Sequence, residues 1–177
     1  GAGGAGGARQ DPASLGALAA AFLTKPGGAR IAMLETGGWD THTAQEGRLR
    51  AQLRALDTLL AALRDGLGDA WAHTVVLVAT EFGRTAAANG TGGTDHGTGA
   101  LAWLAGGAVK GGRILADWPG LGAGQLHEDR DLKPTTALDA LIAGAAAETF
   151  RLDPERLARA LFPLAPPVRP LTGLVAA

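Results

Sequence analysis

The sequence predicts an α/β fold in which helices flank a mostly parallel sheet. Two short apolar runs, residues 30–36 and 74–80, are bounded by glycine or polar residues and have the composition of buried strands. Between them, leucines recur every three or four positions over residues 44–67, which is the period of an amphipathic helix. A strand, a helix and a second strand form a βαβ unit, and this unit favours parallel strands.

The other predicted elements follow from capping and breaking residues. Asp11 and Pro12 provide an N-cap and a first-turn proline for a helix over residues 15–23. Residues 101–104 form a short third strand, and the paired glycines within residues 106–112 predict a turn or a hairpin.

The C-terminal third is predicted to be helical and then extended. One helix runs from Thr135 or Thr136 to Phe150, with an apolar face. Asp153 and Pro154 begin a shorter helix that continues to Leu161.

Composition limits the classes of protein. The chain has 177 residues, enough for one domain with a core. Its net charge of -1 argues against a nucleic-acid or anionic-membrane partner held by bulk charge. There is no cysteine, so disulfides and thiolate metal sites are excluded. No apolar run approaches the roughly 18 residues of a membrane span, and no signal peptide is recognisable.

The domain organisation is predicted in three parts. Residues 1–10 are glycine- and alanine-rich and read as a flexible linker or a truncated loop. Residues 11–165 form the globular part, and the proline-containing residues 166–177 form an extended tail. Because the chain begins with glycine rather than methionine, we expect a piece of a longer protein.

Two clusters of aspartate and histidine follow the two predicted strands. Asp40 and His42 lie in the string GGWDTH, and Asp95 and His96 lie in GGTDHG, within a long glycine-rich loop. Ligands gather at the carboxyl ends of strands in open α/β sheets, so the two clusters are expected to converge. Aspartate with neutral histidine suits Zn or Mn.

Each cluster also has a simpler interpretation. Asp40 and His42 can face the same side of an extended segment, or Asp40 can cap the following helix beside an ordinary loop histidine. Asp95 and His96 are adjacent and diverge, which would send one ligand to each of two metals. The alternative is a solvated glycine-rich turn.

Neighbouring residues supply further candidates. Arg84 can contact an anionic substrate oxygen or form a structural ion pair with Glu81. His127 or Asp131 can fold back as an additional ligand, or can belong to ordinary loop structure. Asn89 precedes a glycine and predicts a turn.

Two further residues are predicted to have neither a catalytic nor a metal-binding role. His73 precedes the second predicted strand, at the wrong end of the sheet, and is predicted to be structural. Ser14 is the only serine and lies in the first predicted helix, which argues against a serine hydrolase.

An ordered set of short strings resembles the C-terminal half of the DUF1501 family, over about residues 29–163. The matching strings are GGWDTH at 37–42, TEFGRT at 80–85, NG at 89–90, GTDHG at 93–97, GGAVKGG at 106–112, DLKPTT at 131–136 and LFP at 161–163. Members of this family are similar in fold to the alkaline phosphatase and sulfatase superfamily and often carry a twin-arginine export signal.

The resemblance implies a three-layer α/β sandwich that is incomplete at its N-terminus. It implies one or two Zn or Mn ions held by Asp40, His42, Asp95 and His96, with His42 as a ligand or a base and Arg84 on the substrate anion. The spacing of Asp40 and His42 departs from the superfamily pattern, in which the two ligands are four apart. His127 is the only histidine late enough to be the third.

The expected function is hydrolysis of a small anionic phosphate or sulfate ester, in the bacterial periplasm. The nucleophile segment of the superfamily has no counterpart in this chain. A phosphomutase-like or phosphonate-acting relative is a weaker possibility. The alternative from another class is an exported, non-catalytic metal-binding or scaffold protein.

Overall fold

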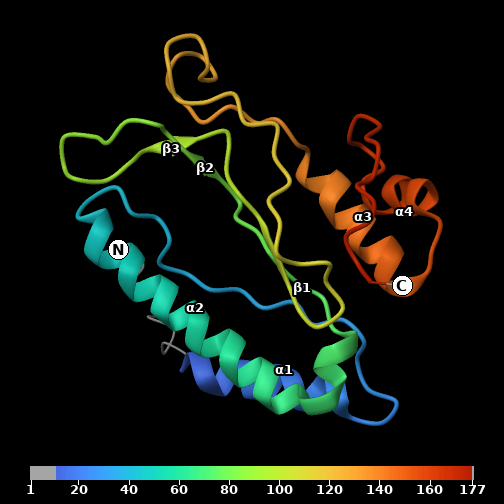
Figure 1. Cartoon of the computed structure of the whole chain (residues 1–177). Helices are drawn as coiled ribbons and strands as arrows, with labels where there is room; N and C mark the ends of the chain where they lie inside the picture. The colour runs from blue at the N-terminus through green and yellow to red at the C-terminus, as the bar shows by residue number, and fades with distance from the viewer. Residues whose placement is uncertain (1–10, 177) are drawn as a thin grey trace, which may run out of the picture. The chain divides into compact units, whose positions relative to one another are not determined.

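Helices lie at both ends of residues 11–176, the part of the chain that the computed structural model describes, and four short strands lie between them in the sequence (Figure 1). The predicted linker at residues 1–10 lies outside this part. Two compact units form: residues 11–40 with Glu46–Ala70, and Thr41–Gln45 with residues 71–176. The elements are α1 (Pro12–Thr24), α2 (Gln45–Leu67), the 3-10 helix η1 (Gly68–His73), β1 (Val76–Val78), β2 (Gly83–Arg84), β3 (His96–Gly97), β4 (Trp103–Ala105), α3 (Leu138–Phe150) and α4 (Pro154–Leu161).

The first unit is built on two closely packed helices. The N-cap expected for α1 is present, because Asp11 Oδ2 accepts a hydrogen bond from the Ser14 amide at 2.9 Å. A Cβ placed on Gly16 would lie 2.3 Å from the carbonyl oxygen of Leu59. The backbone of α1 therefore approaches the backbone of α2 at a point where no side chain fits.

Helix α2 confirms the period read from the sequence. It runs over Gln45–Leu67, and its buried residues are leucines spaced three or four apart: Leu56, Leu59, Leu63 and Leu67. Leu53 belongs to the same series but is 39% exposed. The buried stripe is therefore narrower than the leucine pattern predicts.

The first predicted strand is wrong. Residues 30–36 are extended but form no ladder within the described chain, and Ile31 and Met33 are 72% and 94% exposed. An apolar run specifies a strand only where a neighbour supplies the backbone hydrogen bonds. Residues 30–36 therefore join no sheet among residues 11–176.

The predicted parallel sheet is wrong for a related reason. Residues 74–80 do contain a strand, β1, but it pairs antiparallel with β4, with Leu77 opposite Leu104. The other small sheet pairs β2 with β3, also antiparallel. Because no strand precedes α2 in the described chain, there is no βαβ crossover to make strands parallel. The expected three-layer sandwich is thus replaced, over residues 11–176, by four α-helices and two two-stranded antiparallel sheets.

The C-terminal helices match their predictions closely. Helix α4 starts after the N-cap Asp153, whose Oδ1 accepts from the Arg156 amide at 2.7 Å. The last described residues pack on α3: a Cβ on Gly144 would lie 2.1 Å from the Leu171 carbonyl oxygen, and Leu174 is 1% exposed. The Glu148 carboxylate accepts from the amides of residues 173–175.

Burial and hydrogen bonding oppose each other at Glu148. Burial raises the pKa of Glu148, but the hydrogen bonds from Val175, Gly173 and Leu174 outweigh it, and the pKa falls below its usual value. The carboxylate therefore fastens the C-terminal residues to α3 in its ionised form.

No helix among the described residues is both long enough and apolar enough to cross a membrane.

Candidate metal centre

His42 lies on a short segment, Thr41–Gln45, that is docked on the loop of residues 89–94 by backbone contacts. The amides of Ala44 and Gln45 donate to the carbonyls of Thr91 and Gly92 at 3.2 and 2.9 Å. A Cβ on Gly93 would lie 2.2 Å from the His42 carbonyl oxygen, so only glycine allows this approach. The two clusters therefore meet in the structure, although not at the edge of a parallel sheet, where their convergence was expected.

The side-chain amide of Asn89 connects the His42 segment with the loop of residues 89–94, using both its nitrogen and its oxygen. Its Nδ2 donates to the His42 carbonyl at 2.9 Å and to Asp95 Oδ1 at 3.0 Å. Its Oδ1 accepts from the amides of Thr91 and Gly93, each at 3.0 Å. The turn predicted at Asn89 is present, and the side chain also fixes the carboxylate next to the histidine.

Asp95 contacts His42 directly. Asp95 Oδ1 and His42 Nδ1 are 3.0 Å apart, and the side chains are 55% and 42% exposed. The hydrogen bond from Asn89, and then the one from His42, lower the pKa of the Asp95 carboxyl below its usual value. Asp95 is therefore held ionised as a hydrogen-bond acceptor.

His96 is placed by the β2–β3 pair, in which it lies opposite Arg84. Its ring stacks on Phe82, with centroids 4.2 Å apart and planes inclined by 17°. The His96 ring also lies next to the His42 ring, and the centroids of the two imidazoles are 4.8 Å apart. Strand pairing and aromatic stacking thus fix an imidazole next to His42.

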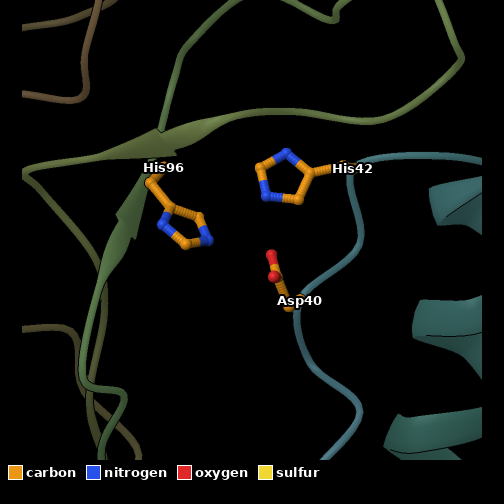
Figure 2. Close-up of side chains that lie close together, drawn as sticks. All are labelled: Asp40, His42 and His96. Carbon is orange, nitrogen blue, oxygen red and sulfur yellow. The ribbon is translucent and has the colours of Figure 1, made fainter. Parts of the chain in front are cut away.

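Asp40 completes a group of three potential metal ligands. One ligand atom from each of Asp40, His42 and His96 lies within 4.8 Å of the others. Figure 2 shows one nitrogen of each imidazole and the Asp40 carboxylate turned toward a common space. Asp40 precedes His42 by two residues, so the chain itself keeps their Cα atoms within about 7 Å.

The donor set can be tested against a metal ion. Ligand atoms about 2.1 Å from a tetrahedral Zn lie about 3.4 Å apart, so the three groups need to close by at most about 1.4 Å. Small side-chain rotations at these positions, of which Asp40 and His96 are exposed, can supply such a movement. Two imidazoles and one carboxylate also match the ligand types that Zn and Mn accept.

Arg84 has a structural environment. Its Nη1 donates to the Thr94 carbonyl at 2.8 Å, and its guanidinium carbon lies 5.0 Å from the Phe82 ring centroid. These contacts hold the loop that carries Asp95 and support the ring that stacks on His96. Contact of Arg84 with a substrate anion stays a prediction.

Arg130 is a second cation near the site, and the sequence reasoning missed it. Its Nη2 donates to the His96 carbonyl at 3.3 Å, and its Nε donates to Asp131 Oδ1 at 2.8 Å. Asp131 is 4% exposed and also accepts from Thr98 Oγ1 at 2.9 Å. The charged string HEDRD at residues 127–131 is the only signal that could have indicated this anchor.

The ion pair perturbs both of its partners. The hydrogen bond from Arg130 lowers the pKa of Asp131, and the same bond raises the pKa of Arg130. Asp131 thus holds Arg130, whose guanidinium donates to the His96 carbonyl. Neither Asp131 nor His127 belongs to the three-residue ligand group found among residues 11–176.

The family comparison agrees with the resemblance in the sequence. The family model described as "Protein of unknown function (DUF1501)" matches residues 5–162. No curated protein matches the chain, and no solved structure matches it.

Proposed function

The chain belongs to the DUF1501 family, and we propose that Asp40, His42 and His96 form a divalent-metal centre for hydrolysis of phosphate or sulfate esters. The observation that carries the proposal is the meeting of two imidazoles and a carboxylate from two separate sequence clusters. Hydrolysis of phosphate or sulfate esters is proposed by analogy with the chemistry of alkaline phosphatases and sulfatases and not with their fold, since the expected three-layer sandwich is not observed.

Three protein ligands are the number typical of catalytic zinc sites, which keep a further position open. A bound Zn or Mn would supply Lewis-acid polarisation of an ester oxygen and would stabilise negative charge. A closed structural site would instead need a fourth protein ligand. The donor set therefore favours a centre that meets a small molecule.

The chain's own residues would bind and orient the substrate. Arg130 is 62% exposed at its side chain and lies beside His96, so its guanidinium can pair with a phosphate or sulfate oxygen. Arg84, fixed on Phe82, is the second candidate for the anion. An anionic ester thus meets two cations close to the proposed ligands.

A non-catalytic metal-binding protein is the second candidate, and the solvent exposure of the side chains at the site favours it. His42 and Asp95 are 42% and 55% exposed, whereas catalytic metal sites draw on a dry, shaped cavity. The same ligands would then hold a metal for binding or scaffolding.

Metal content and turnover separate these functions. The full chain is purified without chelators, loaded with Zn or Mn, and assayed by elemental mass spectrometry and on aryl phosphates and aryl sulfates. We expect near-stoichiometric metal in the wild type and its loss in His96→Ala and His42→Ala. His73→Ala, on η1, is the matched control and should retain the metal.

Each outcome has a definite meaning. Metal with turnover that is lost in His96→Ala supports the hydrolase. Metal without turnover supports the binding protein. Absence of metal in the loaded wild type overturns both.

A further inference from the structure

We infer that Asp95 is a positioning residue: it fixes the tautomer of His42 so that Nε2 presents its lone pair to the metal. This inference rests on the proposed metal centre and adds a specific role for a carboxylate outside the ligand group. It differs from the sequence-based expectation that Asp95 is itself a ligand.

The contact with Asp95 determines where the His42 imidazole carries its proton. An ionised carboxylate only accepts hydrogen bonds, so the 3.0 Å contact between Asp95 Oδ1 and His42 Nδ1 requires a proton on Nδ1. A neutral imidazole with Nδ1–H carries its lone pair on Nε2. The hydrogen-bond network therefore assigns the tautomer that metal binding through Nε2 needs.

The direction of the His42 ring agrees with this tautomer. Figure 2 shows a nitrogen of the His42 ring turned toward Asp40 and His96. The ligand-group geometry, with atoms within 4.8 Å, places His42 toward the same two residues. A carboxylate on one ring nitrogen and a metal on the other is the common arrangement of metal-ligating histidines.

Asp95 is itself held through both its side chain and its backbone. Asn89 Nδ2 donates to the same Asp95 Oδ1 at 3.0 Å, and the orientation of this amide is fixed because Asn89 Oδ1 accepts from two backbone amides. The Asp95 backbone is bound to Thr85 on both sides: Thr85 N donates to Asp95 O at 3.0 Å, and Asp95 N donates to Thr85 Oγ1 at 3.2 Å. Asp95 is thus immobilised as an acceptor before any metal arrives.

Asp95 acts by positioning His42 rather than by ligation. Its Oδ1 atom is already engaged by both His42 and Asn89. The three-residue ligand group contains Asp40, His42 and His96, without Asp95. Direct ligation would require Asp95 to release His42.

The test reads the tautomer and the metal affinity separately. Long-range proton–nitrogen NMR on histidine-labelled full chain, metal-free and at mildly alkaline pH, reports which nitrogen of His42 carries the proton. We expect Nδ1–H in the wild type and a shift toward Nε2–H in Asp95→Ala. Zn titration should give a Kd about 10- to 100-fold higher for the variant.

Two further variants keep the test decisive. Asp139→Ala removes a carboxylate at the start of α3, whose oxygen accepts only from the adjacent amide, and should change neither readout. If Asp95→Ala does not fold, Asp95→Asn retains the shape and removes the charge, and its Kd should rise in the same range.

The failures are distinguishable. A wild type that binds no Zn overturns the proposed function, while the tautomer still decides the role of Asp95 toward His42. Nε2–H in the metal-free wild type, or an unchanged tautomer and Kd in the Asp95 variant, overturns the inference. Loss of one of two bound ions in that variant identifies a direct ligand and overturns it too.

Discussion

The helix pair of the first unit and the loops of the metal centre are held by opposite kinds of interaction. Between α1 and α2 the buried residues are small or aliphatic, among them Ala19, Ala20 and Leu63. Around His42 the two loop segments are joined by hydrogen bonds, and the buried residues are Thr41 and Gly93. Apolar burial is non-directional, whereas hydrogen bonds need a donor and an acceptor at fixed positions.

The difference tells where substitutions act. In the helix pair, the volume of the buried side chains determines stability, and a polar substitution on the surface should change stability little. In the loops, the loss of a single hydrogen-bond donor or acceptor should affect stability more than a change in side-chain volume. The following substitutions test this contrast, from the largest expected effect to the smallest.

Leu63→Ala should have the largest effect on stability. Leu63 is 4% exposed, and removing its side chain leaves a cavity that costs about 2–5 kcal/mol in the free energy of unfolding. Urea denaturation followed by circular dichroism measures the loss. Leu53→Ala on the same helix, at 39% exposure, is the control, and an equal loss in both variants would contradict the assigned core.

Asn89→Ala should weaken the loops without disturbing the helices. The amides of Thr91 and Gly93 lose their acceptor, and Asp95 loses a donor. Leaving these groups unsatisfied should lower the free energy of local opening by about 1–3 kcal/mol. Amide exchange in the loop should therefore be about 5- to 150-fold faster. Hydrogen exchange by mass spectrometry over residues 89–95 measures this. Leu63→Ala should leave exchange there unchanged, and similar acceleration in both variants would remove the contrast.

Sequence reasoning succeeded where the physics is periodic. Leucine spacing gives α2, and Asp-Pro caps give α1 and α4, because helices satisfy their backbone hydrogen bonds locally. The first strand and the parallel arrangement failed because strand pairing is not local, whereas β1 lies within the predicted run 74–80 and β4 overlaps the predicted run 101–104. Residues 30–36 carry a strand-like composition but join no β-ladder within the described chain.

The candidate site was predictable in residue type rather than in geometry. Asp40, His42 and His96 were identified by spacing, and they do meet. The contact of Asp95 with His42 depends on Asn89, the only asparagine in the chain, which by itself indicates just a turn. A role that depends on one amide bridging two distant segments has no pattern along the chain.

Glu148→Gln should give a smaller, pH-dependent loss of about 1 kcal/mol. The pKa of Glu148 is lowered in the folded state, so its contribution is fully present above the usual value of 4.5 and is lost as pH falls through the folded pKa. Urea unfolding of wild type and variant at neutral and acidic pH checks this. The difference between them should vanish in acid, where protonated glutamate resembles glutamine, and a constant difference would contradict the ionised anchor.

Glu46→Ala should have the smallest effect, although its hydrogen bond is short. Glu46 Oε1 accepts from Arg50 Nη2 at 2.7 Å, but the side chains are 87% and 62% exposed. Water and salt screen such a pair, and i,i+4 pairs contribute about 0.3–0.5 kcal/mol. Urea denaturation at low and high salt measures this, with Asp57→Ala as a control on the same helix. If Glu46→Ala lost as much stability as Asn89→Ala, the geometry of a polar contact, rather than its solvent exposure, would determine its contribution. The contrast between the helix pair and the loops would then fail.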